Sequence, residues 1–186
     1  MIYTEEQYKK VAAPGLKKLL GIKNDFAVPK LLKVTVNIGT GKDHKDAKFL
    51  EAAIKDVVRI TGQQPIKTYA KKSISSFDVK EGDQVGIKVT LRRKMMYEFL
   101  DRLINSVLPR MRDFKGLSLK GFDKQGNYSL GMKEHTVFPE ISSDEVERVH
   151  GLEVVISTSA KSRDEGKALL ELIGFPFEKV EPENNK

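Results

Sequence analysis

The chain has 186 residues, no cysteine and a net charge of +7, from 33 basic and 26 acidic side chains. Its length suits one domain with a sizeable core, and the lack of cysteine excludes a disulfide framework and a thiolate metal site. The sequence contains neither an apolar signal segment nor an apolar run of membrane-spanning length, so it predicts a soluble, cytoplasmic protein.

The charge is unevenly distributed along the chain. Residues 1–120 carry 25 basic and 13 acidic side chains, whereas residues 121–186 carry 8 basic and 13 acidic ones. A basic surface attracts polyanions such as nucleic acids through long-range electrostatics. We therefore expect the first two-thirds of the chain to meet a polyanion and the acidic last third to meet a different partner, for which a basic one would be suited.

The first predicted elements are a helix, a strand and a second helix. The run TEEQ at residues 4–7 has the form of a capping box, which predicts a helix over residues 4–20 that Pro14 bends or divides. Alternating apolar and polar residues predict a strand over residues 31–38. Its dry side would carry Leu32, Val34, Val36 and Ile38. Apolar residues at helical spacing predict a helix over residues 46–60. Its inner stripe would consist of Ala47, Leu50, Ile54, Val57 and Val58.

A long polar loop over residues 71–84 precedes the next strand. A loop of this length in a compact domain is either functional or disordered, and its cations favour a phosphate contact. Simple flexibility is the alternative. Alternation then predicts a strand over residues 85–93, and an apolar stripe predicts a helix over residues 95–107.

The last elements are a strand and a helix. Alternation predicts a strand at residues 152–156, and Ser162 with Glu165 three residues later opens a helix to about residue 173. Residues 178–186 are predicted to be a disordered tail. Cleanly alternating strands have one wet and one dry face. The predicted fold class is therefore α+β: a two-layer α/β sandwich of residues 1–177, a single domain with a mainly antiparallel sheet, helices packed on one face and the other face open.

The wet face of this predicted sheet is free of carboxylates. Its side chains are cations, hydroxyls and an amide: Lys33, Thr35, Asn37, Lys88, Thr90, Arg92, Ser157 and Ser159. A random solvated face in a chain that is 32% charged should include Asp or Glu. Their absence indicates an anionic ligand and predicts an RNA-binding sheet.

Residues 108–131 alternate cations, aromatics and glycines without a helical period. Phe114, Phe122 and Tyr128 lie among five basic residues in this segment. Such a composition is typical of surfaces that contact phosphates and bases. The alternative is a solvated hairpin region whose aromatics only attach it to the core.

Signals for catalysis or cofactor binding are weak. The run GTGK at residues 39–42 follows a strand, but Asp43 stands where a P-loop needs Ser or Thr, so we interpret the run as a tight turn. His44, His135 and His150 have no metal-ligand spacing and are interpreted as surface residues. The sequence therefore predicts a protein that is not an enzyme and requires no cofactor and no metal.

Seven segments, in order along nearly the whole chain, carry a family resemblance. They are VPKLLKVTVNIGTG (28–41), TGQQPIKTYAKKSISSF (61–77), IKVTLRRKMMYEFLDRLI (87–104), LPRMRDFKGLS (108–118), FDKQGNYSLG (122–131), FPEI (138–141) and STSAKSRDEGKALLELIGFPF (157–177). Together they resemble the bacterial form of the large-subunit ribosomal protein family that binds 5S rRNA, conventionally number five of that subunit.

The resemblance implies a structural protein whose open sheet face holds 5S rRNA in the central protuberance of the large subunit. By motif, Asn37, Gln63 and Thr90 match the family's rRNA-facing positions. The alternation argument extends the same surface to Lys33, Thr35, Lys88 and Arg92.

The resemblance also implies two further contacts. The loop at residues 71–84 would reach toward tRNA in the peptidyl site, through Lys71, Lys72, Ser73, Ser75 and Lys80. The stretch at residues 135–150 would face a protein of the small-subunit head, through His135, Glu140, Asp144, Glu145 and Glu147. The expected partners are thus 5S rRNA, large-subunit rRNA, tRNA and that protein, with no membrane and no small-molecule substrate.

The chain departs from the family pattern at a few positions. Arg93 stands where glycine is expected, His150 stands where arginine is common, and Lys42 with Asp43 replaces a more acidic pair. An alternative function that uses the same sheet is that of a non-ribosomal RNA-binding regulator or chaperone.

Overall fold

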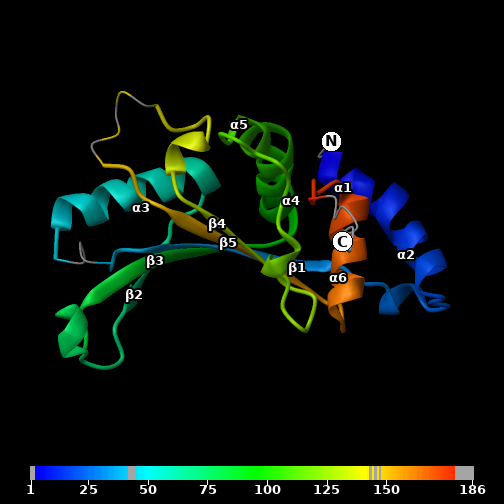
Figure 1. Ribbon diagram of the computed structural model, residues 1–186, viewed down its shortest axis with the longest axis horizontal. Coiled ribbons are helices and arrows are strands. Elements are labelled where there is room, and N and C mark those ends of the chain that lie inside the picture. Colours follow the sequence, from blue (N-terminus) through cyan, green and yellow to red (C-terminus); the bar gives the residue numbers. More distant parts are fainter. Residues whose placement is uncertain (1–2, 42–44, 143, 145, 147, 179–186) are drawn as a thin grey trace, which may run out of the picture.

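The computed structural model describes residues 3–41, 45–142, 144, 146 and 148–178, which form an α+β fold on one antiparallel sheet. The strands are β1 (Leu31–Gly39), β2 (Ile66–Tyr69), β3 (Gln84–Leu91), β4 (Tyr128–Met132) and β5 (Leu152–Thr158), in the order β2-β3-β1-β5-β4. Every neighbouring pair is antiparallel. The predicted fold class is confirmed, because helices pack on the sheet and leave one face open (Figure 1).

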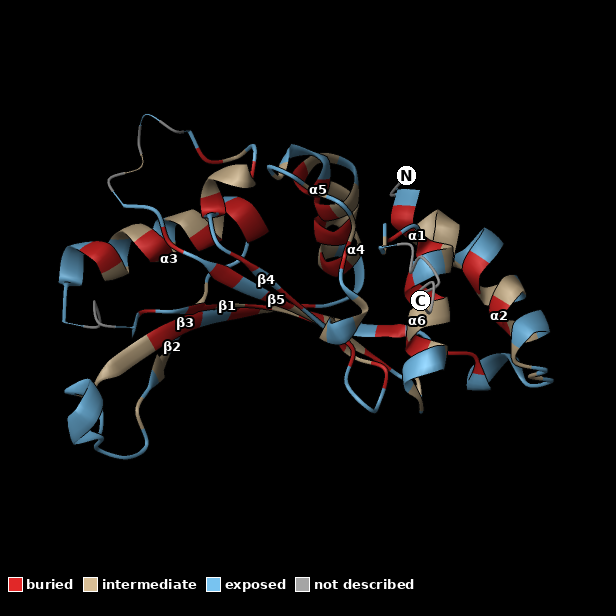
Figure 2. Ribbon diagram, in the orientation of Figure 1, coloured by how far each residue is buried: buried red, intermediate tan, exposed pale blue. Residues whose placement is uncertain are grey.

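The helices form two groups. On one face of the sheet lie α3 (Ala47–Thr61) and α4 (Arg93–Arg102), which continues through the π-helical η5 (Leu103–Val107) into α5 (Leu108–Arg110). At one end of the sheet, α1 (Tyr3–Gln7), the π-helical η1 (Tyr8–Ala12) and α2 (Ala13–Leu19) pack beside α6 (Arg163–Ile173). Short 3-10 turns occur at η2 (Asp25–Ala27), η4 (Ser75–Phe77), η6 (Leu119–Gly121) and η7 (His135–Val137). Figure 2 shows the buried residues on the helix sides that face the sheet. None of the described helices is long and apolar enough to span a membrane.

Side-chain caps and left-handed residues set the limits of the long helices. Asp46 accepts a hydrogen bond from the backbone N–H of Lys48 at 3.0 Å, and α3 ends at Gly62, whose φ is +70°. Ser162 caps α6 as predicted, because its hydroxyl accepts from the backbone N–H of Glu165 at 3.3 Å.

The predicted capping box at residues 4–7 is wrong. Thr4 lies inside α1 with 1% of its surface exposed, and its hydroxyl donates to Asp101 of α4 at 3.2 Å. Packing against α4 thus replaces the local capping role. Pro14 lies in the first turn of α2, directly after η1. The N-terminal helix therefore changes to π-helical geometry at η1, just before the proline, and continues as α2 without a break.

Two apolar faces differ from their predictions. Leu32 is 43% exposed, because a register shift against β5 between Leu31 and Lys33 turns Leu31 inward instead. On α3, Ala47 is exposed and three members of the predicted stripe are only half-buried. The buried apolar face of α3 consists of Phe49, Ala53, Val57 and Ile60. The helix is thus rotated relative to the prediction.

Arg93 occupies a backbone conformation that favours glycine. Its φ is +49°, in the left-handed region that costs an L residue roughly 1–2 kcal/mol. The family pattern expects glycine at this position, so the backbone shape is the one expected, although the side chain is not.

Candidate nucleic-acid interface

The uncovered face of the sheet brings together polar side chains from β1, β3 and β5. Cross-strand partners lie side by side on the same face of a sheet. The strand register forms three such polar pairs: Thr35 with Thr90, Asn37 with Lys88, and Lys33 with Ser157. Helices α3 and α4 lie on the other side of the sheet (Figure 1). We call the surface formed by these six residues, with Gln63, Arg92 and Glu153 described below, the open face.

Gln63 and Arg92 extend the open face toward α3 and α4. Gln63 is exposed after α3 and donates from Nε2 to the backbone oxygen of Thr90 at 3.3 Å. Arg92 is exposed and extended, with φ −138° and ψ 161°, and it is the N-cap residue of α4. It therefore continues the alternation of Lys88 and Thr90. The structure thus brings the residues predicted to bind rRNA onto one surface.

The prediction that this surface is free of carboxylates is wrong at Glu153. Glu153 of β5 is the register partner of Asn37 and is exposed, and the apolar Val155 stands opposite Thr35 in the same way. The cations therefore lie on β3 and at the start of β1, where Lys33 is placed. On β5 the open face carries the acidic Glu153, the apolar Val155 and the hydroxyl of Ser157.

The connection between β2 and β3 is a structured hairpin tip that extends beyond the sheet (Figure 1). Ala70 donates to the backbone oxygen of Asp83 at 2.8 Å, and Ile74 pairs with Val79 nearer the tip. The residues predicted to contact tRNA are all exposed here: Lys71, Lys72, Ser73, Ser75 and Lys80. Phe77, in the same tip, is 70% exposed.

The aromatic residues of the segment 108–131 belong to the core. Phe122 is 8% exposed and Tyr128 is 2% exposed. Their ring centroids lie 4.7 Å apart, and each also contacts Phe177, at 5.4 and 5.5 Å. Phe114 is partly buried against the same core. The alternative interpretation is therefore correct for these side chains, which attach the segment to the core and present no stacking surface.

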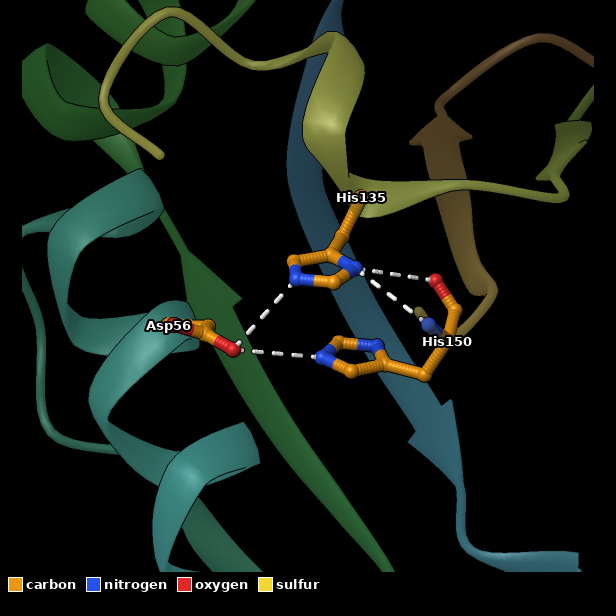
Figure 3. A group of neighbouring side chains, drawn as sticks. All are labelled: Asp56, His135 and His150. Carbon is orange, nitrogen blue, oxygen red and sulfur yellow. Dashed lines mark hydrogen bonds and ion pairs between the residues drawn. The ribbon is translucent and has the colours of Figure 1, made fainter. Parts of the chain in front are cut away.

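A buried pair of histidines lies between α3 and the segment that leads into β5. The rings of His135 and His150 stack with centroids 3.8 Å apart and planes within 4° of parallel. Figure 3 shows both Nε2 atoms facing one carboxylate oxygen of Asp56, at 3.6 and 3.4 Å. His135 is 1% exposed and His150 is 9% exposed. The interpretation as surface histidines is wrong for these two, and His44 lies outside the described residues.

These three side chains have ligand types that suit a transition metal, with their ligand atoms within 4.8 Å of one another. In the structure both Nε2 atoms contact one oxygen of Asp56, so the three side chains form a carboxylate shared by two imidazoles. The backbone N–H of His150 also donates a hydrogen bond to Nδ1 of His135, at 3.3 Å, which holds the two residues together.

Burial lowers the pKa of His135, and the adjacent His150 lowers it further, while Asp56 and the backbone of His150 act in the opposite direction. The unfolded chain therefore takes up the proton at a higher pH than the folded protein does. Stability that depends on neutral His135 is complete above the unfolded pKa and is lost as the pH falls below it.

We expect the free energy of unfolding to fall as the pH drops below about 6.5, by at most about 1.4 kcal/mol per pH unit from His135. Urea denaturation across this range measures the effect. The control is His135→Gln, whose amide cannot be protonated in this range and whose stability should depend less on pH. Parallel pH profiles for the two proteins would contradict the assignment to His135.

The predicted acidic flank is only partly available to a partner. Glu140 is half-buried, and one of its oxygens pairs with Nε of Arg102 at 2.9 Å. Asp144 is exposed. Glu145 and Glu147 lie outside the described residues, as do Lys42 and Asp43.

Comparisons with known proteins identify the family that the chain resembles. A family model described as "Ribosomal protein L5" matches residues 24–80, and a second model, which describes the C-terminus of the same ribosomal protein family, matches residues 84–177. A relative from Caldanaerobacter subterraneus subsp. tengcongensis, named "Large ribosomal subunit protein uL5", is 52% identical over 94% of this chain and 97% of its own length. A protein of the same name from a Thermoanaerobacter species is 49% identical over the same shares.

Proposed function

The chain belongs to the ribosomal protein L5 family, and from that membership we propose that its open face binds 5S rRNA in the central protuberance of the large ribosomal subunit. As a member of this family it is a structural constituent of the large subunit of the cytoplasmic ribosome and not an enzyme. Its function is therefore to bind and position RNA, without a catalysed reaction.

Within the structure, the observation that carries this proposal is the cross-strand register. It places Lys88 beside Asn37 and Thr90 beside Thr35, on a face that helices leave uncovered. Lysine and arginine supply phosphate affinity that depends on salt. Hydroxyl and amide groups can hydrogen-bond ribose hydroxyls and exposed base edges, which are the groups that folded RNA offers. We assign the phosphate contacts to Lys33, Lys88 and Arg92, and the ribose or base contacts to Thr35, Asn37, Gln63 and Thr90.

Two substitutions on β3 test this assignment. Lys88→Ala should weaken binding to 5S rRNA and reduce the slope of log K against log salt by about one phosphate contact. Thr90→Ala should weaken binding with little change in the slope, because it removes no charge. Filter binding at several salt concentrations measures both, with a tRNA of similar charge density as the competing RNA. Equal slopes for Lys88→Ala and the parent would count against the phosphate contact.

We propose that the hairpin tip contacts tRNA in the peptidyl site. The tip extends away from the sheet, and Lys71, Lys72 and Lys80 are exposed on it. Ser73 accepts a hydrogen bond from the backbone N–H of Glu81 at 2.9 Å, so the tip is braced internally. A braced cationic loop can meet a phosphate backbone without a large ordering cost.

We propose that residues 135–150 face the head of the small subunit. Asp144 is exposed there and suits a basic partner, whereas His135 is buried and would support this surface from beneath. Co-sedimentation with large subunits after a high-salt wash separates a ribosomal role from that of a free RNA-binding regulator or chaperone. Loss of the chain from washed subunits would favour the second role.

A further inference from the structure

Phe26 is the most exposed large apolar side chain in the described part of the molecule, with 95% of its surface accessible. Burying a phenylalanine typically stabilises a protein by about 1.5–3 kcal/mol, and the free protein obtains none of this at Phe26. The backbone beneath the ring is nevertheless ordered. Its N–H donates to Oδ1 of Asn24 at 3.0 Å, and Lys17 of α2 pairs with Asp25 at 2.5 Å.

The residues after Phe26 anchor the η2 turn to the rest of the protein. Val28 is 6% exposed, and Pro29 is buried and accepts a hydrogen bond from the Tyr8 hydroxyl at 3.3 Å. Phe26 is therefore held outward by a fixed turn, and its exposure does not arise from a loose end of chain.

The surroundings of Phe26 are strongly basic. Residues 14–33 contain five lysines and one acidic residue, Asp25. The lysines are Lys17, Lys18, Lys23, Lys30 and Lys33. Lys18, Lys23 and Lys30 are exposed. Proteins that bind single-stranded nucleic acids combine exposed aromatic rings with cations. The ring stacks on a base and the cations contact the nucleic-acid backbone.

The η2 turn also continues the open face. Lys33 is paired with Ser157 on that face, and the backbone N–H of Lys30 donates to the hydroxyl of Ser159 at 3.0 Å. In Figure 1 the blue turn before β1 lies on the same side of the sheet as the hairpin tip, away from α3 and α4. An RNA on the open face that continues past Lys33 and Lys30 therefore reaches Phe26.

We propose that Phe26 is a stacking platform for an unpaired nucleobase of the rRNA that the open face holds, with Lys23 and Lys30 contacting the flanking phosphates. The inference rests on the proposed function and adds a binding site at the end of the sheet where β1 begins. Stacking on an aromatic ring tolerates any base, so Phe26 contributes affinity and local RNA geometry more than sequence selectivity.

Affinity for a 5S rRNA transcript is the first test. Phe26→Ala should raise the Kd about tenfold, while the salt slope stays unchanged because no charge is removed. Phe26→Tyr keeps a stacking ring and should bind like the parent. The matched control is Leu19→Ala on the neighbouring α2, where Leu19 is also an exposed apolar side chain, at 68%, and no loss of affinity is expected.

The chain contains no tryptophan, which allows a direct measurement of stacking. Phe26→Trp introduces a single fluorophore at the proposed site, and its emission should be strongly quenched when saturating 5S rRNA stacks on it. In Leu19→Trp the fluorophore lies outside the proposed site, and its emission should change little.

Each outcome decides the proposal. Parent affinity in Phe26→Ala, or unquenched emission from Phe26→Trp at saturation, overturns the stacking site. If Phe26→Ala binds 5S rRNA normally but enters large subunits poorly, the ring contacts another component of the subunit and the proposal is again wrong. In these cases Lys88→Ala still weakens binding, so the proposed function stands. If the parent protein does not bind 5S rRNA, both the function and the stacking site fail.

Discussion

Gly166→Ala is expected to destabilise the protein by about 3 kcal/mol, although a glycine-to-alanine change in a helix normally stabilises it by about 1 kcal/mol. Gly166 lies in α6 against the turn at residues 123–127. A Cβ at this position would stand 2.3 Å from the backbone oxygen of Gly126 and 2.6 Å from its Cα. Both are backbone atoms, so the clash cannot be relieved by a change of rotamer.

The turn that faces α6 has little freedom to move away. Asp123 accepts hydrogen bonds from the backbone N–H groups of Gln125 and Asn127, both at 2.8 Å. The oxygen of Gly126 accepts from the Thr158 hydroxyl at 2.9 Å. A shift of the turn would therefore break its link to the end of β5. The destabilisation by Gly166→Ala thus arises from the loss of hydrogen bonds between side chains and the backbone of the turn, or from overpacking.

Gly15→Ala is the matched control for this prediction. Gly15 also lies in a helix, α2, but its added Cβ would meet only the flexible end of Leu172, at 3.2 Å. We expect this variant to be as stable as the parent or slightly more stable. Urea denaturation of the two variants gives the comparison, and similar midpoints for both would show that α6 and the turn separate easily.

The sheet and its open face were predictable only where the pattern was long and regular. β1 and β3 have 9 and 8 residues, which is long enough for alternation to define both faces. β2 has four residues at an edge of the sheet, none of them buried, so it has no apolar face to predict it. β4 alternates, but its five residues include Gly131 and lie within a segment whose cations and glycines indicate an irregular surface.

Glu153 could have been placed on the open face from its own strand. The alternation of β5 correctly places Val154 and Ile156 inward, and it therefore places Glu153 outward, on the face that the helices leave uncovered. The register adds that its cross-strand partner there is Asn37. The register depends on the shift between Leu31 and Lys33, which also turned Leu32 outward and which no local pattern reveals.

The histidine pair could not be predicted from the sequence either, but for a different reason. His135 and His150 lie 15 residues apart, and His150 lies 94 residues from Asp56. No helical or strand period joins positions at these separations. Their contact follows from the packing of α3 above the chain that enters β5, which is a tertiary property. Phe26 was likewise missed, because nothing in the sequence around it distinguishes an exposed aromatic from one that packs in the core.

Thr90→Glu is expected to lower the affinity for 5S rRNA about 100-fold or more at low salt. Thr90 is half-buried in the middle of the open face, opposite Thr35, with Lys88 two residues before it on β3 and Arg92 two residues after it. A carboxylate there would stand among the phosphates that these cations attract, and like charges forced together cost several kcal/mol. Salt screens this repulsion, so the loss should shrink as ionic strength rises, as it also should for Lys88→Ala, whose salt slope is shallower than that of the parent. The hydrogen bond from Gln63 goes to the backbone oxygen of Thr90, so it survives the change, and the fold should lose at most about 1 kcal/mol.

The decisive comparison is with Thr90→Gln, which has nearly the same size as the glutamate variant and no charge. The difference in Kd between the two isolates the carboxylate from the loss of the hydroxyl. Ser142→Glu adds the same charge at an exposed position outside the open face and should leave the affinity unchanged. If Thr90→Glu and Thr90→Gln bind 5S rRNA equally well, then phosphates do not approach Thr90. The assignment of the rRNA contacts to the middle of the open face would then be wrong.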